Sequence, residues 1–388
     1  MRDVILRDGR LRRWLSLLIF ACVAAVAGVG CNGFGTEETL LVGHLLPRTG
    51  RDAELGQALM TAAAITVDSW NQDEPKSING RSVSVVHADT ASQLDPFAFQ
   101  TTRLLAVNQV AAVVGGIDSP EAERIRQALA ARDNAPCGIT MAGVLNRSPS
   151  STMWGVGISP IERGRYLARF AAEDEKLAQV VIVVDTRLPT ALDIHRAFVQ
   201  EFRHPDRQII AEHLVQSPEE MRAIVASWPD GSSAALVFVS QRDSLDNFLP
   251  LARGGKVKVL YAGEDEERVW RQPPEEPIFF ATAFPGDQAS DAFQRLATDF
   301  RQRCQQELSP ASLLTAEAFR ILLSAGKKAR SLRRDSLQRE LEKLEIDLPS
   351  GAFWFEKDGE ARRPVSIFRA EKGQRRWMKS YRPEKQKK

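Results

Sequence analysis

The chain has 388 residues, of which 43% are hydrophobic and 26% are charged, an ordinary globular composition with room for two domains. Its 52 Lys and Arg residues nearly balance its 50 Asp and Glu residues, so the formal net charge is +2. This balance excludes a molecule-wide basic field, and we expect no nucleic-acid partner.

The first thirty residues have the pattern of a secretory signal peptide. Five arginines between Arg2 and Arg13 precede an apolar run from Trp14 to Gly30, which ends in small residues. The run is a little short for a spanning helix, which needs about 20 residues. A polar, glycine-containing stretch follows it. We therefore predict a signal peptide at 1–30 and a tether at 31–38.

Cys31 is the candidate lipid anchor. The segment Ala27-Gly28-Val29-Gly30-Cys31 resembles a bacterial lipobox, although Gly28 stands where such boxes usually carry Leu. The resemblance implies that the thiol is diacylated, which anchors a protein stably. An uncleaved anchor helix and plain secretion are the alternatives. All three place the body of the chain on the periplasmic or cell-surface side of a bacterial membrane.

Beyond residue 38, short apolar and β-branched runs alternate with longer amphipathic stretches. Runs such as Val180–Val184 are hydrophobic throughout, as central parallel strands are. The predicted strands are Leu40–Leu46, Val83–His87, Ala111–Gly115, Cys137–Met141, Val180–Asp185, Ile209–Leu214, Ala235–Ser240, Val257–Tyr261 and Ile278–Ala283. Helices are predicted around 53–70 and at 95–108, 119–133, 161–177, 190–203, 217–228, 242–254, 288–307 and 312–330.

The alternation of strands and helices predicts an α/β fold with doubly wound parallel sheets. Nine strands exceed one core of usual size, so we expect two sheets. The last part of the sequence has a different pattern, one that favours antiparallel hairpins. Its predicted strands are Gly351–Phe355, Val365–Arg369 and Arg375–Met378. Cys137 and Cys304 could form a disulfide in an exported protein or remain two separate buried thiols.

Several short motifs occur in the order typical of one family. Val42–Gly50 is similar to an opening G-x-x-x-P-x-T-G, and Ile78–Arg81 to an I-N-G-R turn. Val113–Ser119 is similar to V-I-G…S, and Gly351–Gly359 to G-x-x-x-F-D-x-x-G. Together they resemble the Leu/Ile/Val-binding family, the type I solute-binding proteins of ABC importers, over about residues 39–382.

The resemblance implies two Rossmann-like lobes joined by a three-crossing hinge. Lobe 1 would comprise 39–157 plus 284–333, and lobe 2 would comprise 158–283 plus 334–382, with a basic tail at 383–388. The carboxyl ends of the strands would hold the ligand between the lobes.

In lobe 1, Ser119 stands where the family's carboxylate-binding serine stands, just before a helix that Pro120 opens. A helix N-terminus suits a carboxylate, but Ser before Pro is also an ordinary N-cap. Thr49 belongs to the opening motif. The segment that contains Thr140, Ala142 and Gly143 resembles the family's second binding segment, with Gly143 in place of a threonine.

In lobe 2, Glu264 or Asp265 would bind the ligand's ammonium group, or both could belong to a solvated acidic loop. Arg187, Gln241 and Arg242 follow strands where the family often has tyrosines. The two arginines could bind an anion or face solvent.

The sequence contains no pattern that indicates catalysis. Its five histidines lack metal-ligand spacing, and it has no Cys-x-x-Cys, Gly-x-Ser-x-Gly or phosphate-loop motif, so we predict no enzyme activity, metal or cofactor. The prediction is a lipid-anchored receptor that closes on an amino acid, small amide or related polar solute and docks on permease membrane subunits. The alternative is a non-transport envelope lipoprotein or sensor with the same fold.

Overall fold

The computed structural model describes residues 39–143, 152–228, 235–239, 245–252, 257–287, 289–356 and 359–383. Residues Leu40–Lys388 form one compact unit. The predicted signal peptide, the tether with Cys31 and most of the basic tail lie outside the described residues. Within the described part, no helix is both long and apolar enough to cross a membrane.

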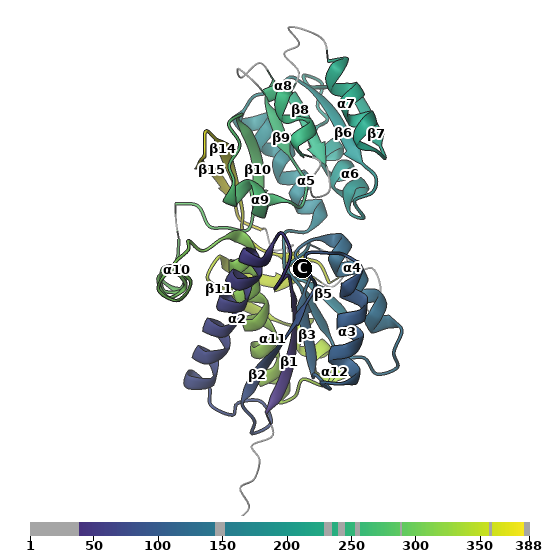
Figure 1. Cartoon of the computed structure of the whole chain (residues 1–388). Helices are drawn as coiled ribbons and strands as arrows, with labels where there is room; N and C mark the ends of the chain where they lie inside the picture. Colours follow the sequence, from purple (N-terminus) through teal and green to yellow (C-terminus); the bar gives the residue numbers. More distant parts are fainter. Residues whose placement is uncertain are drawn as a thin grey trace, which may run out of the picture. The chain divides into compact units, whose positions relative to one another are not determined.

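The first sheet has five parallel strands in the order β2-β1-β3-β4-β5 (Figure 1). They are β1 (Leu40–Leu46), β2 (Val83–Asp89), β3 (Ala112–Gly115), β4 (Gly138–Thr140) and β5 (Met153–Gly155). The four predicted strands are confirmed. The fifth, β5, was not predicted, because three residues give too short a run to show a strand pattern.

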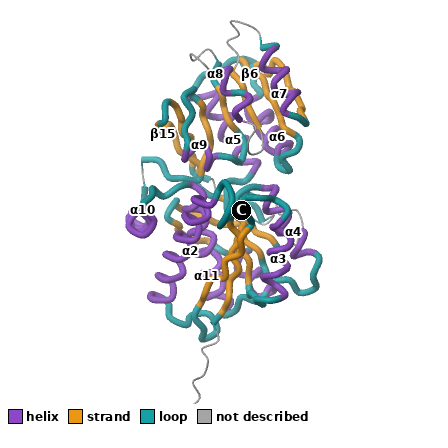
Figure 2. The backbone as a smooth tube through the Cα atoms, in the orientation of Figure 1, coloured by secondary structure: helices purple, strands orange, loops and turns teal. Residues whose placement is uncertain are grey.

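Helices cover both faces of this sheet, as the alternating pattern predicts (Figure 2). Val114 packs in one core cluster with residues of α2 (Ala53–Asp73) and α11 (Pro310–Ala329). Its neighbour Val113 packs in another cluster with α3 (Pro96–Ala106) and α4 (Ser119–Ala130), because successive strand residues point to opposite faces. Two further helices flank this layer: α10 (Asp291–Cys304) packs on α2, and α12 (Arg334–Leu341) packs on α11.

The second sheet has seven strands in the order β15-β14-β10-β9-β8-β6-β7. They are β6 (Gln179–Asp185), β7 (Gln208–Val215), β8 (Ala235–Val239), β9 (Val259–Tyr261), β10 (Ile278–Thr282), β14 (Val365–Glu371) and β15 (Gln374–Tyr381). The first five are parallel, and β14 and β15 add the predicted antiparallel hairpin.

The helices of the second sheet also lie in two layers. One layer holds α5 (Pro160–Arg169), which continues as a π-helical turn over Phe170–Asp174, and α6 (Ala191–Phe202). The other holds α7 (Pro218–Ala226), α8 (Leu249–Ala252) and α9 (Glu266–Arg271). Of the helix predicted at 242–254 the structure describes residues 245–252, which form a 3₁₀ turn, Leu245–Asn247, and the four residues of α8.

A small antiparallel sheet precedes the last hairpin. It consists of β11 (Glu345–Leu348), β12 (Gly351–Phe355) and β13 (Ala361–Arg362). Two separate sheets, one parallel and one parallel except for its last hairpin, with helices on both faces, confirm the predicted α/β fold class. The proposed lobe boundaries themselves stay a prediction.

Both described cysteines are free thiols, so the possible disulfide between them is not formed. Cys137 is buried before β4, and burial raises the pKa of its thiol to about 12. This thiol is therefore protonated and unreactive at neutral pH.

A buried ion pair ties together four segments that are distant in sequence. Arg363 and Glu317 are both fully buried, and the guanidinium Nη2 lies 2.6 Å from Glu317 Oε2. The same Nη2 donates to Ser350 Oγ at 2.7 Å, and Nη1 donates to the Val156 carbonyl. Glu317 Oε1 accepts the Ser350 N–H at 2.8 Å. The pair therefore links α11 to the ends of β5, β11 and β13.

Replacing Glu317 with Ala should be strongly destabilising, because it leaves the Arg363 charge buried without its partner. Breaking such a pair typically lowers the free energy of unfolding by about 3–5 kcal/mol. Urea unfolding would measure the loss. Lys327→Ala on the same helix is the control, since it breaks only an exposed pair with Glu74 and should change the value by less than about 1 kcal/mol. Equal effects of the two variants would contradict the assignment.

Candidate functional site

The strand order of the first sheet places a crevice beside α4. The chain moves to opposite sides of β1 to form β2 and β3, so β1 and β3 flank a topological switch point. Ligands of open α/β sheets bind at such points, outside the carboxyl ends of the strands. The loop after β3 leads directly to Ser119 at the start of α4.

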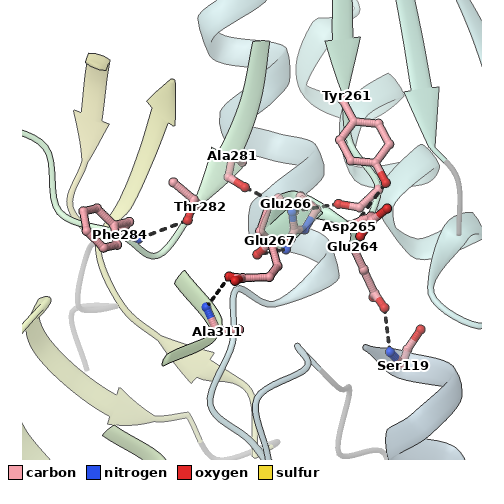
Figure 3. A network of polar contacts seen from close by, with 12 residues as sticks. Ser119, Tyr261, Glu264, Asp265, Glu266, Glu267, Ala281, Thr282, Phe284 and Ala311 are labelled. Atoms are coloured by element: carbon pink, nitrogen blue, oxygen red, sulfur yellow. Dashed lines mark hydrogen bonds and ion pairs between the residues drawn. The ribbon is translucent and has the colours of Figure 1, made fainter. Parts of the chain in front are cut away.

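Ser119 is the first residue of the helix and not its N-cap. The N-cap is Asp118, whose carboxylate accepts the Glu121 N–H at 2.9 Å. The alternative that Ser119 caps the helix is therefore wrong, because the longer acidic side chain one residue earlier reaches the same donor. Ser119 is buried, and its own N–H donates to Glu264 Oε2 at 2.6 Å (Figure 3).

Glu264 uses both of its carboxylate oxygens in contacts with the protein. It lies in the loop between β9 and α9 and is partly buried. Oε2 accepts from Ser119 N, and Oε1 accepts from the Thr190 hydroxyl at 2.6 Å. Burial raises the pKa of Glu264, while the hydrogen bond from Thr190 and the charge of Arg163 act against this shift. The structure thus brings together Ser119 and Glu264, two residues selected from the sequence 145 positions apart.

A second carboxylate of the same segment meets a second helix. Glu267 Oε2 accepts the Ala311 N–H, at the start of α11, at 2.9 Å. Glu267 is buried, which raises its pKa, and the bond from Ala311 partly opposes the shift. Residues 264–267, which we call the acidic segment, therefore place one carboxylate at the N-terminus of α4 and another at that of α11 (Figure 3).

Arg163 contacts both the backbone before the acidic segment and one of the segment's carboxylates. This buried residue of α5 donates through Nη1 to the carbonyls of Gly263 and Ala281, at 2.9 and 3.2 Å. Its Nη2 lies 3.1 Å from Glu266 Oε1. Asp265, the other predicted acid, is buried at the start of α9, and its N–H donates to the Tyr261 hydroxyl at 3.2 Å.

Sequence reasoning missed Arg163, Thr190 and Glu267. An arginine within a helix usually lies at the surface, and nothing near Arg163 in the sequence indicates burial. For Thr190 the one available signal was its position directly before α6, because hydroxyl residues are common helix N-caps. Glu267 continues the acidic run that begins at Glu264, a pattern that by itself is equally typical of a solvated loop.

The other lobe 1 candidates have partners within the protein. The Thr49 hydroxyl donates to Asp89 at 2.7 Å, and the Thr140 hydroxyl donates to the Gly116 carbonyl at 2.6 Å. Ala142 is buried, and its N–H donates back to Thr140. At Gly143 an added Cβ would lie 1.7 Å from the Ile158 carbonyl oxygen, so close backbone packing requires glycine. Ligand contacts of these residues stay a prediction.

Of the arginine and glutamine candidates of lobe 2, only Arg187 lies in the described part of the structure. Arg187 forms two hydrogen bonds of 2.8 Å with the carboxylate of buried Asp185. Gln241 and Arg242 lie outside the described residues. No group of His, Cys, Asp and Glu among the described residues could hold a metal ion.

The space between the acidic segment and the two helix N-termini is small. A cavity of about 20 Å³ remains there, enough for about one water molecule. Ten of the described residues line it: Ile117, Asp118, Met141, Glu264, Asp265, Glu266, Glu267, Pro310, Ala311 and Leu314. A wider hollow of about 960 Å³ lies at the opposite, amino ends of β1, β3 and β4, beside Leu40, Ala111 and Pro136, where open α/β sheets do not usually bind ligands.

A family model described as "Periplasmic binding protein" matches residues 39–375. The chain belongs to this family. No curated protein matches it. Among solved structures, this periplasmic binding protein is similar to a leucine-binding protein LivK from Thermotoga maritima MSB8, with a TM-score of 0.71, 18% identity, and 89% of this chain and 99% of the other covered.

Two further solved structures show the same fold. A solute-binding protein of an ABC transporter from Rhodopseudomonas palustris BisB5, in complex with 3,4-dihydroxybenzoic acid, has a TM-score of 0.71 and 17% identity, covering 90% and 99% of the two chains. A substrate-binding protein of an ABC transporter from Desulfitobacterium hafniense, in complex with Leu, has a TM-score of 0.70 and 17% identity, covering 88% and 100%. At these identities the likeness establishes the type I fold.

The raised pKa values of Glu264 and Glu267 predict how this periplasmic binding protein responds to pH. A raised pKa means that the folded protein binds these protons more tightly than the unfolded chain. The resulting stability is present below the ordinary Glu value of about 4.3 and is lost as pH rises through the folded pKa. Glu264→Gln and Glu267→Gln should therefore reduce the fall in unfolding free energy as the pH rises above about 4.3.

Urea unfolding at several pH values would test this expectation. The control is Glu123→Gln on the exposed side of α4, where a hydrogen bond from Arg126 lowers the pKa of Glu123. That variant should change the pH dependence in the opposite direction, by at most about 1 kcal/mol. A wild-type pH profile in both Gln variants of the acidic segment would contradict the prediction.

Proposed function

We propose that this protein is an extracytoplasmic solute-binding lipoprotein of an ABC importer, with an amino acid, small amide or related polar solute as its ligand. The observation that carries the proposal is the meeting of Ser119 and Glu264 at the switch point of the first sheet. This is the place where the fold binds ligands, and the family match covers both residues.

Transport would require that the solute favours one arrangement of the two lobes. A ligand that contacts both the α4 side and the acidic segment stabilises the arrangement in which they meet, and the permease subunits would recognise that form. The solved relatives hold solutes such as leucine and 3,4-dihydroxybenzoic acid, which supports a small-molecule ligand. We propose no catalytic activity.

One observation favours a second candidate. The cavity of about 20 Å³ beside Ser119 is far smaller than the roughly 300–1,000 Å³ of ordinary ligand sites. A binding protein must therefore open to admit a solute. A protein that has lost its ligand could instead use the same fold as an envelope lipoprotein that contacts other proteins.

Thermal unfolding of the purified full chain with a panel of amino acids, small amides and amines separates the two candidates. A solute at about one hundred times its Kd should add about 2.7 kcal/mol of stability, a shift of several degrees in Tm. If no compound raises Tm and a pulldown from an envelope fraction captures a specific protein, the receptor proposal fails and the protein-contact role replaces it.

The anchor is tested separately. Cys31→Ser should release the protein from the membrane fraction into the soluble fraction of the compartment, because diacylation requires the thiol. Cys137→Ser, at a buried free thiol, is the matched control and should leave the distribution unchanged. Continued membrane association of Cys31→Ser would favour the uncleaved anchor helix.

A further inference from the structure

We propose that Glu264 occupies the position of a ligand carboxylate, so that the solute of this protein is an amine or amide without a free carboxylate. The inference rests on the proposed receptor function and narrows its ligand class. It follows from how the hydrogen-bond donors of α4 are used, from the charge of the cavity lining, and from two buried carboxylate oxygens that lack a donor.

The backbone N–H groups of residues 119–122, in the first turn of α4, are all used within the protein. The N-cap residue and the first three residues of a helix have N–H groups without partners inside the helix. Here Ser119 N–H donates to Glu264, and Pro120 has no N–H. Glu121 N–H donates to the Asp118 carboxylate, and Ala122 N–H donates to the Asp118 carbonyl at 3.0 Å.

The N-terminus of α11 is satisfied in the same way. Pro310 has no N–H, Ala311 donates to Glu267, and Ser312 donates to Ser309 Oγ at 3.4 Å. Leu313 N–H donates to the Ser309 carbonyl at 2.9 Å. A solute carboxylate could accept the Ser119 or Ala311 N–H only by displacing a carboxylate of the protein itself.

The charge of the lining also opposes an anionic solute. Five of the ten lining residues are acids (Asp118 and the four residues of the acidic segment), and none of the ten is Lys, Arg or His. Arg163 neutralises Glu266 but is not among the lining residues. A second anion would be repelled here, whereas an ammonium group carries three donors for such oxygens.

Two carboxylate oxygens of the lining residues, Glu266 Oε2 and Glu267 Oε1, lack a donor among the described residues. Glu266 is buried, and its Oε1 faces Arg163, but its Oε2 has no hydrogen-bond partner among the described residues. A buried carboxylate oxygen without a donor is unfavourable. Because Glu266 lines the cavity, a solute N–H that entered it could supply the missing hydrogen bond.

Two ligand pairs that differ in their carboxylate test the ligand class on the wild-type full chain. The pairs are leucine with 3-methylbutylamine, and benzoate with benzylamine, measured by calorimetric titration. We expect each amine to bind at least about tenfold more tightly than its carboxylate counterpart. Tighter binding of leucine or benzoate would overturn the proposal while leaving the receptor function intact.

Chemical rescue tests the role of Glu264 without reference to transport. Glu264→Ala vacates the N-terminus of α4, so acetate should raise the Tm of this variant and leave that of the wild type unchanged. Glu264→Gln, which fills the space, and Glu123→Ala, on the same helix, should not respond.

The outcomes separate the two proposals. If acetate has no effect on Glu264→Ala, Glu264 does not occupy a carboxylate site and the inference fails. If acetate rescues Glu264→Ala but the wild type binds neither member of either pair and no compound of the thermal-unfolding panel, the assignment of Glu264 stands and the receptor function fails. The ligand-pair measurement uses only the wild type, so it remains decisive if Glu264→Ala does not fold.

Discussion

The acidic segment and the two helix N-termini that it meets define the candidate site. Two carboxylates, Glu264 and Glu267, each accept a backbone N–H at the start of a long helix. Such contacts combine a charge-assisted hydrogen bond with the positive end of a helix dipole. They also remove charge from water, and burial raises the pKa of both groups. Arg163 offsets part of this penalty, since it fixes the backbone of the segment and pairs with Glu266.

This arrangement explains why so little space remains at the expected ligand position. Helix N-termini at a switch point usually leave N–H donors available for a ligand. In this protein the donors of α4 and α11 are used by its own side chains, and the remaining cavity is of about 20 Å³. A site of this kind selects against anionic solutes for two reasons. The protein's own carboxylates occupy the helix N-termini, and the cavity lining is acidic. The same groups would also stabilise the protein without any solute.

The second buried network has a different role. Arg363 and Glu317 lie away from the cavity lining, and they connect α11 with the ends of β5, β11 and β13. A buried ion pair adds little net stability over well-packed apolar residues, but it penalises any arrangement that separates the partners. Since α11 also carries the N–H that Glu267 accepts, the network helps to fix the helix that the acidic segment meets.

The family resemblance selected Ser119 and either Glu264 or Asp265 as site candidates. The sequence by itself determined the α/β class and most strands and helices. These features depend on local patterns: runs such as Val180–Val184 specify a buried strand whatever lies elsewhere. It did not determine β5, the cap at Asp118, or the roles of Arg163, Thr190 and Glu267. Ser119 meets Glu264 across 145 positions, and Arg163 meets Gly263 across 100. Only the tertiary structure decided these contacts, because hydrogen-bond partners and burial depend on which segments the fold brings together.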